Sequence, residues 1–212
     1  MAPGVGGLVI CSINEIGATL RKAALGSGFP IGLADVISSA GVWLCVRDLD
    51  GIGAALEGLD TGYPTGVESQ RIGATLSVSN ARIGRSGISL IELLLAGEVE
   101  RVIVENPDSI MLLVGVAGVG ATNSGMAFAL IFDDASIIID SQRLEASELP
   151  TSQRVEIEIT ESRGQRFQPK RGPVTVDVNQ WETICELAAR IYVPATDESR
   201  LSGAGAGLTD ND

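Results

Sequence analysis

The feature that most constrains the fold of this chain is a 23-residue run without a charged side chain, at residues 110–132. Its length would suit a membrane-spanning helix. However, the polar stretch TNSG at 122–125 interrupts its second half, acidic residues flank it at 108 and 133–134, and no lysine or arginine anchors its ends. The run therefore predicts two buried strands joined by a turn, in a cytoplasmic protein.

Length and composition indicate one globular domain. The chain has 212 residues, and its 45% apolar share and mean hydropathy of +0.27 exclude intrinsic disorder. We predict a single domain over 1–212. It has a helical subregion at 1–62, followed at 67–212 by a mostly β part with a C-terminal helix and a glycine-rich tail.

Local signals predict helices near the N-terminus. Ser12 and Glu15 have the spacing of a capping box, in which each side chain satisfies a backbone N–H of the other residue. Apolar residues then recur at helical spacing up to Gly26. Two more helices are expected, at about 32–46 and 52–59.

The rest of the chain is predicted to be mostly strand. Ser89 and Glu92 repeat the capping-box spacing and predict a short helix over 90–96, and Asn179 with Glu182 predicts a C-terminal helix over about 180–190. The expected strands are 71–79, 99–105, 110–119, 126–132, 135–141, 155–160 and, as partner of the last, 174–178. Because regular β-α alternation is lacking, the predicted fold class is α+β, with N-terminal helices, a mainly antiparallel sheet and one C-terminal helix.

Charge and residue types exclude several functions. The net charge is −12 and neither half is basic, which argues against nucleic-acid binding. The absence of histidine excludes histidine-based catalysis and histidine metal sites. The cysteines, at 11, 45 and 185, form no CxxC pair and favour buried reduced thiols, so no metal site is predicted.

Lys22 and Glu15 are candidate catalytic residues. They lie seven residues apart on the first predicted helix, and so on about the same face. A desolvated lysine can act as a base or a nucleophile. The alternative is that Lys22 only complements the dipole at the C-terminal end of its helix.

Arg82 and Arg85 are candidate anion-binding residues. They lie in a stretch without acidic residues, 69–91, just ahead of a predicted helix N-terminus. Guanidinium groups and free backbone N–H groups together suit a carboxylate or a phosphate. The alternative is that both arginines are solvated and pair with surplus acids.

Motifs at both ends of the chain resemble a known bacterial family. They are SINEI at 12–16, RKAALGSG at 21–28, GLAD at 32–35, WL at 43–44, DLDG at 48–51, YVPATDESR at 192–200 and GAGAGLTDND at 203–212. Together they resemble DUF3726, a family of unknown function. The resemblance implies a cytoplasmic bacterial protein. It also implies that Asn14, Glu15, Lys22, Ser199, Arg200 and the glycine-rich tail are signature positions.

A second resemblance concerns the order helix, glycine-rich break, helix, which is similar to the entry of type-2 malate/lactate dehydrogenases. Those enzymes use a histidine and are much longer, so their activity does not carry over.

Two functional hypotheses stay open. The first is an enzyme or binding protein for a small anionic metabolite. Its predicted ligand-binding residues are Arg82, Arg85, Arg200, Ser199 and Asn14, its catalytic residues Lys22 and Glu15, and the tail at 203–207 would close the site. The second is a non-catalytic accessory subunit, in which the apolar strands of 110–132 and a basic loop at 163–171 build an oligomer interface. A homo-oligomer is expected, and the substrate, reaction and cofactor stay unknown.

Overall fold

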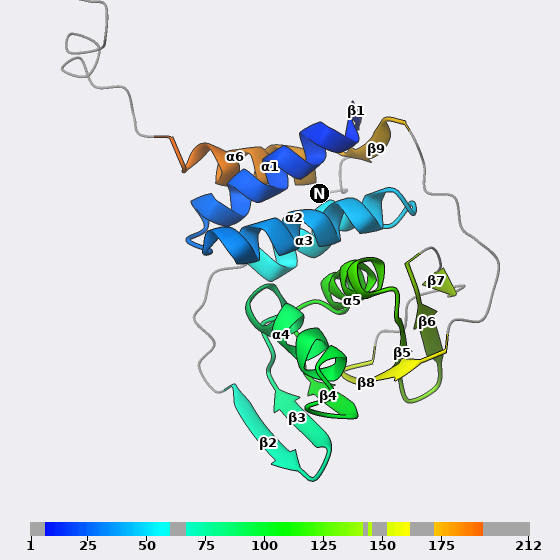
Figure 1. Ribbon diagram of the computed structural model, residues 1–212. Coiled ribbons are helices and arrows are strands. Elements are labelled where there is room, and N and C mark those ends of the chain that lie inside the picture. Colours follow the sequence, from blue (N-terminus) through cyan, green and yellow to red (C-terminus); the bar gives the residue numbers. More distant parts are fainter. Residues whose placement is uncertain (1–6, 60–66, 142–143, 146–151, 162–171, 193–212) are drawn as a thin grey trace, which may run out of the picture.

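The computed structural model describes residues 7–59, 67–141, 144–145, 152–161 and 172–192, and its class is α+β, as predicted (Figure 1). The helices are α1 (Ile13–Gly26), α2 (Ile31–Cys45), α3 (Gly51–Leu59), α4 (Ile83–Leu95), α5 (Ile110–Ser124) and α6 (Val178–Ala189). In Figure 1, α1 and α6 lie side by side in an outer layer, α2 and α3 lie beneath them, α4 and α5 come next, and the large sheet closes the opposite side.

The large sheet has seven strands in the order β2-β3-β4-β8-β5-β6-β7. Their bounds are β2 (Glu68–Ile72), β3 (Thr75–Ser79), β4 (Arg101–Glu105), β5 (Ala127–Ile131), β6 (Ser136–Ile139), β7 (Leu144–Glu145) and β8 (Arg154–Thr160). Every pair is antiparallel except β3–β4, which α4 connects as a crossover. The single strand predicted at 71–79 is in fact the hairpin β2–β3, which turns at Gly73 with φ +59.

The N-terminal helices form as predicted. Ser12 Oγ accepts from the backbone N–H of Glu15 at 3.2 Å, and the Glu15 carboxylate accepts from the N–H of Ser12 at 3.3 Å. This reciprocal cap needs only residues close in sequence, so the spacing alone was sufficient to predict it.

The predicted partner of strand 155–160 is wrong. The segment at 174–178 supplies β9 (Val174–Asp177), which pairs antiparallel with β1 (Leu8–Cys11) in a separate two-stranded sheet. The neighbours of β8 are β4 and β5. Asp177, not Asn179, caps α6, because its carboxylate accepts from the N–H groups of residues 179 and 180.

The prediction of strands at 110–119 is wrong, because this segment forms α5. Ser109 caps the helix by accepting from the N–H of Leu112 at 3.1 Å, and Gly125 ends it with φ +72. Residues 112–118 are all buried. A helix that is buried on every side carries no apolar periodicity, and a strand buried on both faces looks the same in sequence. Within the described ranges, none of the helices combines the length and apolarity that crossing a membrane requires.

The predicted start of α4 at residue 90 is also wrong. The helix begins at Ile83, and Ser89 lies inside it. The backbone N–H of Ile83 donates to Asp108 Oδ1 at 2.8 Å, so the N-terminal cap comes from a residue 25 positions away. A cap of this kind leaves no local sequence pattern.

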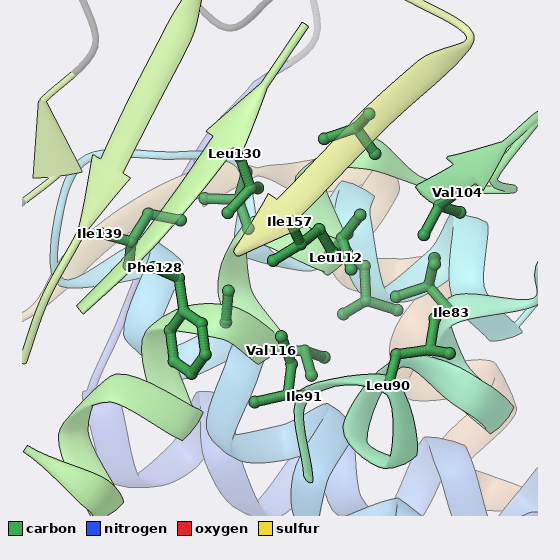
Figure 2. Packing of buried hydrophobic residues seen from close by; sticks show 14 of the residues in the cluster. Ile83, Leu90, Ile91, Val104, Leu112, Val116, Phe128, Leu130, Ile139 and Ile157 are labelled. Atoms are coloured by element: carbon green, nitrogen blue, oxygen red, sulfur yellow. The ribbon is translucent and has the colours of Figure 1, made fainter. Parts of the chain in front are cut away.

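The larger core lies between the sheet and helices α4 and α5. Figure 2 shows side chains of α4 (Ile83, Leu90, Ile91) and α5 (Leu112, Val116) pointing toward side chains of the strands. A second cluster joins α1, α3, α6 and the β1–β9 ribbon, and α2 contributes residues to both clusters. The two clusters meet across α2.

The contact between α2 and α5 depends on the glycines of α5. A Cβ added to Gly118 would lie 2.2 Å from Cε2 of Trp43, and one added to Gly115 would lie 2.9 Å from the backbone oxygen of Ala40. We expect Gly118→Ala to lower the free energy of unfolding by about 2 kcal/mol, because the indole must move. Chemical denaturation measures this change.

The matched control is Gly32→Ala, at an exposed position in the first turn of α2 where an added Cβ meets nothing within 4 Å. It should raise the free energy of unfolding by about 0.5 kcal/mol, since alanine loses less backbone entropy in a helix. Equal effects of the two substitutions would contradict the close approach.

Candidate functional site

The two predicted catalytic residues lie on α1 but make separate contacts. Lys22 Nζ donates to Tyr192 Oη at 2.9 Å and lies 5.5 Å from the centre of the Tyr192 ring. The Glu15 carboxylate belongs to the cap of α1. Among the described residues, no hydrogen bond or ion pair joins Lys22 to Glu15.

The predicted anion-binding arginines lie at the start of α4. Arg82 Nη1 is 3.9 Å from Asp108 Oδ2, and the Arg85 guanidinium carbon is 4.5 Å from the centre of the Phe29 ring. Asn14 is exposed on α1. Ser199, Arg200 and the tail lie outside the described residues, as does the basic loop at 163–171. The assignment of these residues to a site stays a prediction.

A groove between the C-terminal ends of α2 and α5 is the strongest candidate site in the described part of the chain. Its volume is about 390 Å³. Its lining comes from three segments: Ser39, Val42, Trp43, Val46 and Arg47 of α2 and its end, Val119, Thr122 and Asn123 of α5, and Ser141 after β6. We call it the α2–α5 groove.

Arg47 supplies the positive charge of the α2–α5 groove. Its guanidinium carbon lies 3.7 Å from the centre of the Trp43 ring. Nη1 donates to the backbone oxygen of Trp43 at 3.0 Å, and Nη2 donates to that of Ser141 at 3.3 Å. Burial lowers the pKa of Arg47 to about 10, while the nearby Asp140 acts to raise it. The guanidinium therefore stays charged at neutral pH and is fixed in position.

Trp43 supplies an unused hydrogen-bond donor. Only 6% of the residue is exposed, and its ring packs against Gly118 of α5. Its buried Nε1 has no hydrogen-bond acceptor among the residues that the structure describes. Leaving such a donor unsatisfied costs about 1–3 kcal/mol.

A second cavity, of about 290 Å³, lies where the α2–α3 connection meets β9 and α6. Two of its carboxylates have structural partners: Asp50 accepts from the N–H of Gly53 and from Gln180 Nε2, and Asp177 caps α6. Burial raises the pKa of the Cys45 thiol to about 11, which keeps it protonated. Within the described residues, no three acidic, cysteine or histidine side chains group as metal ligands.

Sequence reasoning missed Trp43 and Arg47 as site residues. A signal was present, because a spacing of four residues on a helix places an arginine over a preceding tryptophan. What made the pair a groove wall was the approach of α5, which had been predicted as strand.

The buried carboxyl of Asp108 gives a test of the α4 cap. We expect Asp108→Ala to lower the free energy of unfolding by about 1–2 kcal/mol, because the N–H of Ile83 loses its acceptor. Asp108→Asn should cost much less, since its amide oxygen can still accept. Urea denaturation at pH 7 measures both, and equal losses would contradict the cap.

The pH dependence of these variants follows from burial, which raises the pKa of Asp108 above its ordinary value, against the lowering effects of the Ile83 N–H and of Arg82. The charged form is therefore disfavoured in the folded state at neutral pH. As the pH falls through the folded-state pKa, this cost is relieved, and wild type should gain stability relative to Asp108→Asn.

Comparison with solved structures shows the fold alone. A dehydrogenase from Sinorhizobium meliloti is similar at a TM-score of 0.53 and 9% identity, over 86% of this chain and 100% of that one. Malate dehydrogenases from Pyrococcus horikoshii OT3 and Entamoeba histolytica are each 12% identical, with TM-scores of 0.44 and 0.45, over 65% and 81% of this chain. This chain covers about half of their length, 52% and 49%.

Comparison with protein families gives a match over part of the chain. No curated protein matches the chain. A family model described as "Protein of unknown function (DUF3726)" matches residues 11–89, from the end of β1 into α4. The predicted motifs at the C-terminal end lie outside the matched residues. Over 11–89, which includes Trp43 and Arg47, the chain is similar to the DUF3726 family.

Proposed function

We propose that this protein binds a small anionic ligand in the α2–α5 groove. The observation that carries the proposal is the Arg47 guanidinium, fixed against the Trp43 ring in the wall of a groove of about 390 Å³. Ligand sites of small molecules are concave, mostly apolar, and carry a few fixed polar groups. The groove has each of these properties.

The fixed position of Arg47 favours binding. Its two hydrogen bonds to backbone oxygens restrict the side chain before any ligand arrives, so little conformational entropy remains to be lost. The valine walls at 42, 46 and 119 lower the local polarity, which strengthens a charge-assisted hydrogen bond. The hydroxyl of Thr122 and the amide of Asn123 provide further polar contacts for orienting the ligand.

This proposal keeps the predicted ligand class and changes the residues that bind it. Arg82 lies beside Asp108 and Lys22 donates to Tyr192, and neither residue lines the α2–α5 groove. The roles predicted for these residues stay predictions, and so do a catalytic activity and a bacterial cytoplasmic setting.

The accessory-subunit hypothesis has lost one of its two supports. It relied on apolar strands in 110–132, but residues 112–118 form the buried part of α5 and cannot contact a partner without unfolding. Its other support, the loop at 163–171, lies outside the described residues. We therefore favour ligand binding.

The proposal predicts a specific effect of Arg47→Gln. In a screen of carboxylates and phosphates, an anion that raises the melting temperature of wild type should bind Arg47→Gln roughly 10- to 100-fold more weakly, the loss expected for a hydrogen bond to a charged group. Calorimetric titration measures the ratio. The matched control is Arg190→Gln, which removes the same charge from an exposed site at the end of α6.

Unchanged affinity in Arg47→Gln would contradict the proposal, provided that circular dichroism shows both variants folded. If Arg190→Gln loses as much affinity as Arg47→Gln, the weaker binding comes from the lower net charge of the protein and not from a site at Arg47.

The pH dependence of binding follows from the pKa of Arg47. Because this pKa is about 10, the positive charge is constant between pH 7 and 9, and so should be the affinity. Affinity should fall as the pH rises through about 10, since deprotonation removes the charge that attracts the ligand. A fall centred near pH 7 would point to another titrating group.

A further inference from the structure

We infer that two copies of this chain associate through β1, whose free edge pairs antiparallel with β1 of the second copy. The contact joins the two β1–β9 ribbons into one four-stranded sheet in the order β9-β1-β1-β9. This association does not involve the α2–α5 groove or its ligand. Three features of β1 point to it: exposed aliphatic side chains, backbone groups directed outward, and an edge without protecting residues.

β1 carries the two most exposed large apolar side chains in the described part of the chain. Leu8 is 73% exposed and Ile10 is 70% exposed. They share one face of the strand, because side chains alternate and those of Val9 and Cys11 pack into the second hydrophobic cluster. In Figure 1, the β1–β9 ribbon lies beside the outer helices α1 and α6, away from the large sheet. Its outward face therefore offers aliphatic surface to a partner.

The free edge of β1 presents the backbone groups of the same two residues. The N–H of Val178 donates to the carbonyl oxygen of Gly7 at 2.9 Å, across the ribbon. In an antiparallel pair, alternate residues direct their N–H and C=O groups toward the partner strand. The groups of residues 7, 9 and 11 therefore face β9, and those of Leu8 and Ile10 face away from it. Among the described residues, no further strand pairs with this edge.

The two ends of the large sheet are protected, whereas the free edge of β1 is not. Proteins keep strand edges from pairing with other chains by placing charged residues or proline on them, or by keeping them short. β2 carries Glu68 and Arg71, and β7 has only two residues. The sequence of β1 is LVIC, without a charge or a proline. Of these three edges, β1 is the one open to pairing.

A second copy is the partner that fits, because β1 is complementary to itself. With a two-fold axis at Val9, Leu8 lies opposite Ile10 of the second copy, and Ile10 lies opposite its Leu8. These residues have the outward backbone groups, so each opposing pair exchanges two hydrogen bonds. The aliphatic side chains become cross-strand neighbours on one face and shield one another from water. β1 has no charged side chain that would oppose its own copy.

The contact is small, so the dimer should be weak and reversible. β1 has four residues, and a pair of such strands buries less than the about 1,200 Å² that marks stable complexes. Each copy also carries a net charge of −12, which opposes association at low ionic strength. We therefore expect a dissociation constant of about 10 µM to 1 mM in about 0.15 M salt.

Sedimentation equilibrium of the full chain measures this constant for wild type, for Ile10→Lys and for the matched control Ile72→Lys. Ile10 and Ile72 are 70% and 69% exposed on edge strands, and both substitutions add the same charge. Ile10→Lys should weaken the dimer roughly tenfold or more, because it puts a charge opposite Leu8 of the second copy. Ile72→Lys should change the constant by less than about twofold, as is usual for an exposed site outside the contact.

Cross-linking tests the register of the two strands. Leu8→Cys and Ile10→Cys are each made with Cys185→Ser, which removes the half-buried thiol and leaves the two buried ones. In the antiparallel pair, the Cα atoms of positions 8 and 10 lie about 5.5 Å apart, within the range for a disulfide, while identical positions are diagonal at about 7–8 Å. On oxidation of a mixture, the mixed disulfide should form several-fold faster than either symmetric one.

Each outcome decides one part of the inference. A wild-type chain that stays monomeric up to about 1 mM overturns the dimer. If a dimer forms and Ile10→Lys weakens it no more than Ile72→Lys does, β1 is not the contact. If the mixed disulfide has no advantage, the two-fold axis at Val9 is wrong. Circular dichroism checks that the variants are folded, and the wild-type and cross-linking measurements decide the matter if Ile10→Lys is not.

Discussion

The packing of α2 against α5 is the contact on which the rest of the structure depends. Side chains of α2 enter both hydrophobic clusters, so this helix joins the outer helices to the layer that covers the sheet. The helices can approach closely because α5 presents glycine at 115 and 118, opposite the backbone of Ala40 and the ring of Trp43. Larger residues there would separate the two clusters.

The same contact creates the candidate site. Near its C-terminal end, α5 carries Thr122 and Asn123, which are exposed, and Val46 and Arg47 follow directly after α2. The two helix ends therefore leave a groove that is partly apolar, and Arg47 is the charged residue among the described residues that line it. Trp43 takes part in both, since its ring packs against Gly118 and the residue also lines the groove.

Prediction from the sequence succeeded where the decisive contacts are local. The capping box of α1 needs only neighbouring residues and formed as expected. The strands expected at 126–132 and 135–141 follow each other closely in the chain, and they form the antiparallel neighbours β5 and β6. Prediction failed where residues far apart in the sequence make the decisive contact. Asp108 caps the start of α4, which lies 25 positions before it in the chain. The segment predicted to pair with 155–160 forms β9 and pairs with β1 instead. The candidate site depends on such distant contacts, because its residues come from α2, α5 and the segment after β6.

By itself, the sequence determined the α+β class, the three N-terminal helices and the absence of histidine chemistry, because composition and short-range spacing are sufficient for these. Only the tertiary structure decided that the uncharged run begins as a helix. Its apolar side chains are compatible with a buried strand or a buried helix, and the difference lies in what packs around them. In this fold, Trp43, Leu44 and Ile91 pack against the glycines of α5. The α2–α5 groove exists because this segment forms a helix.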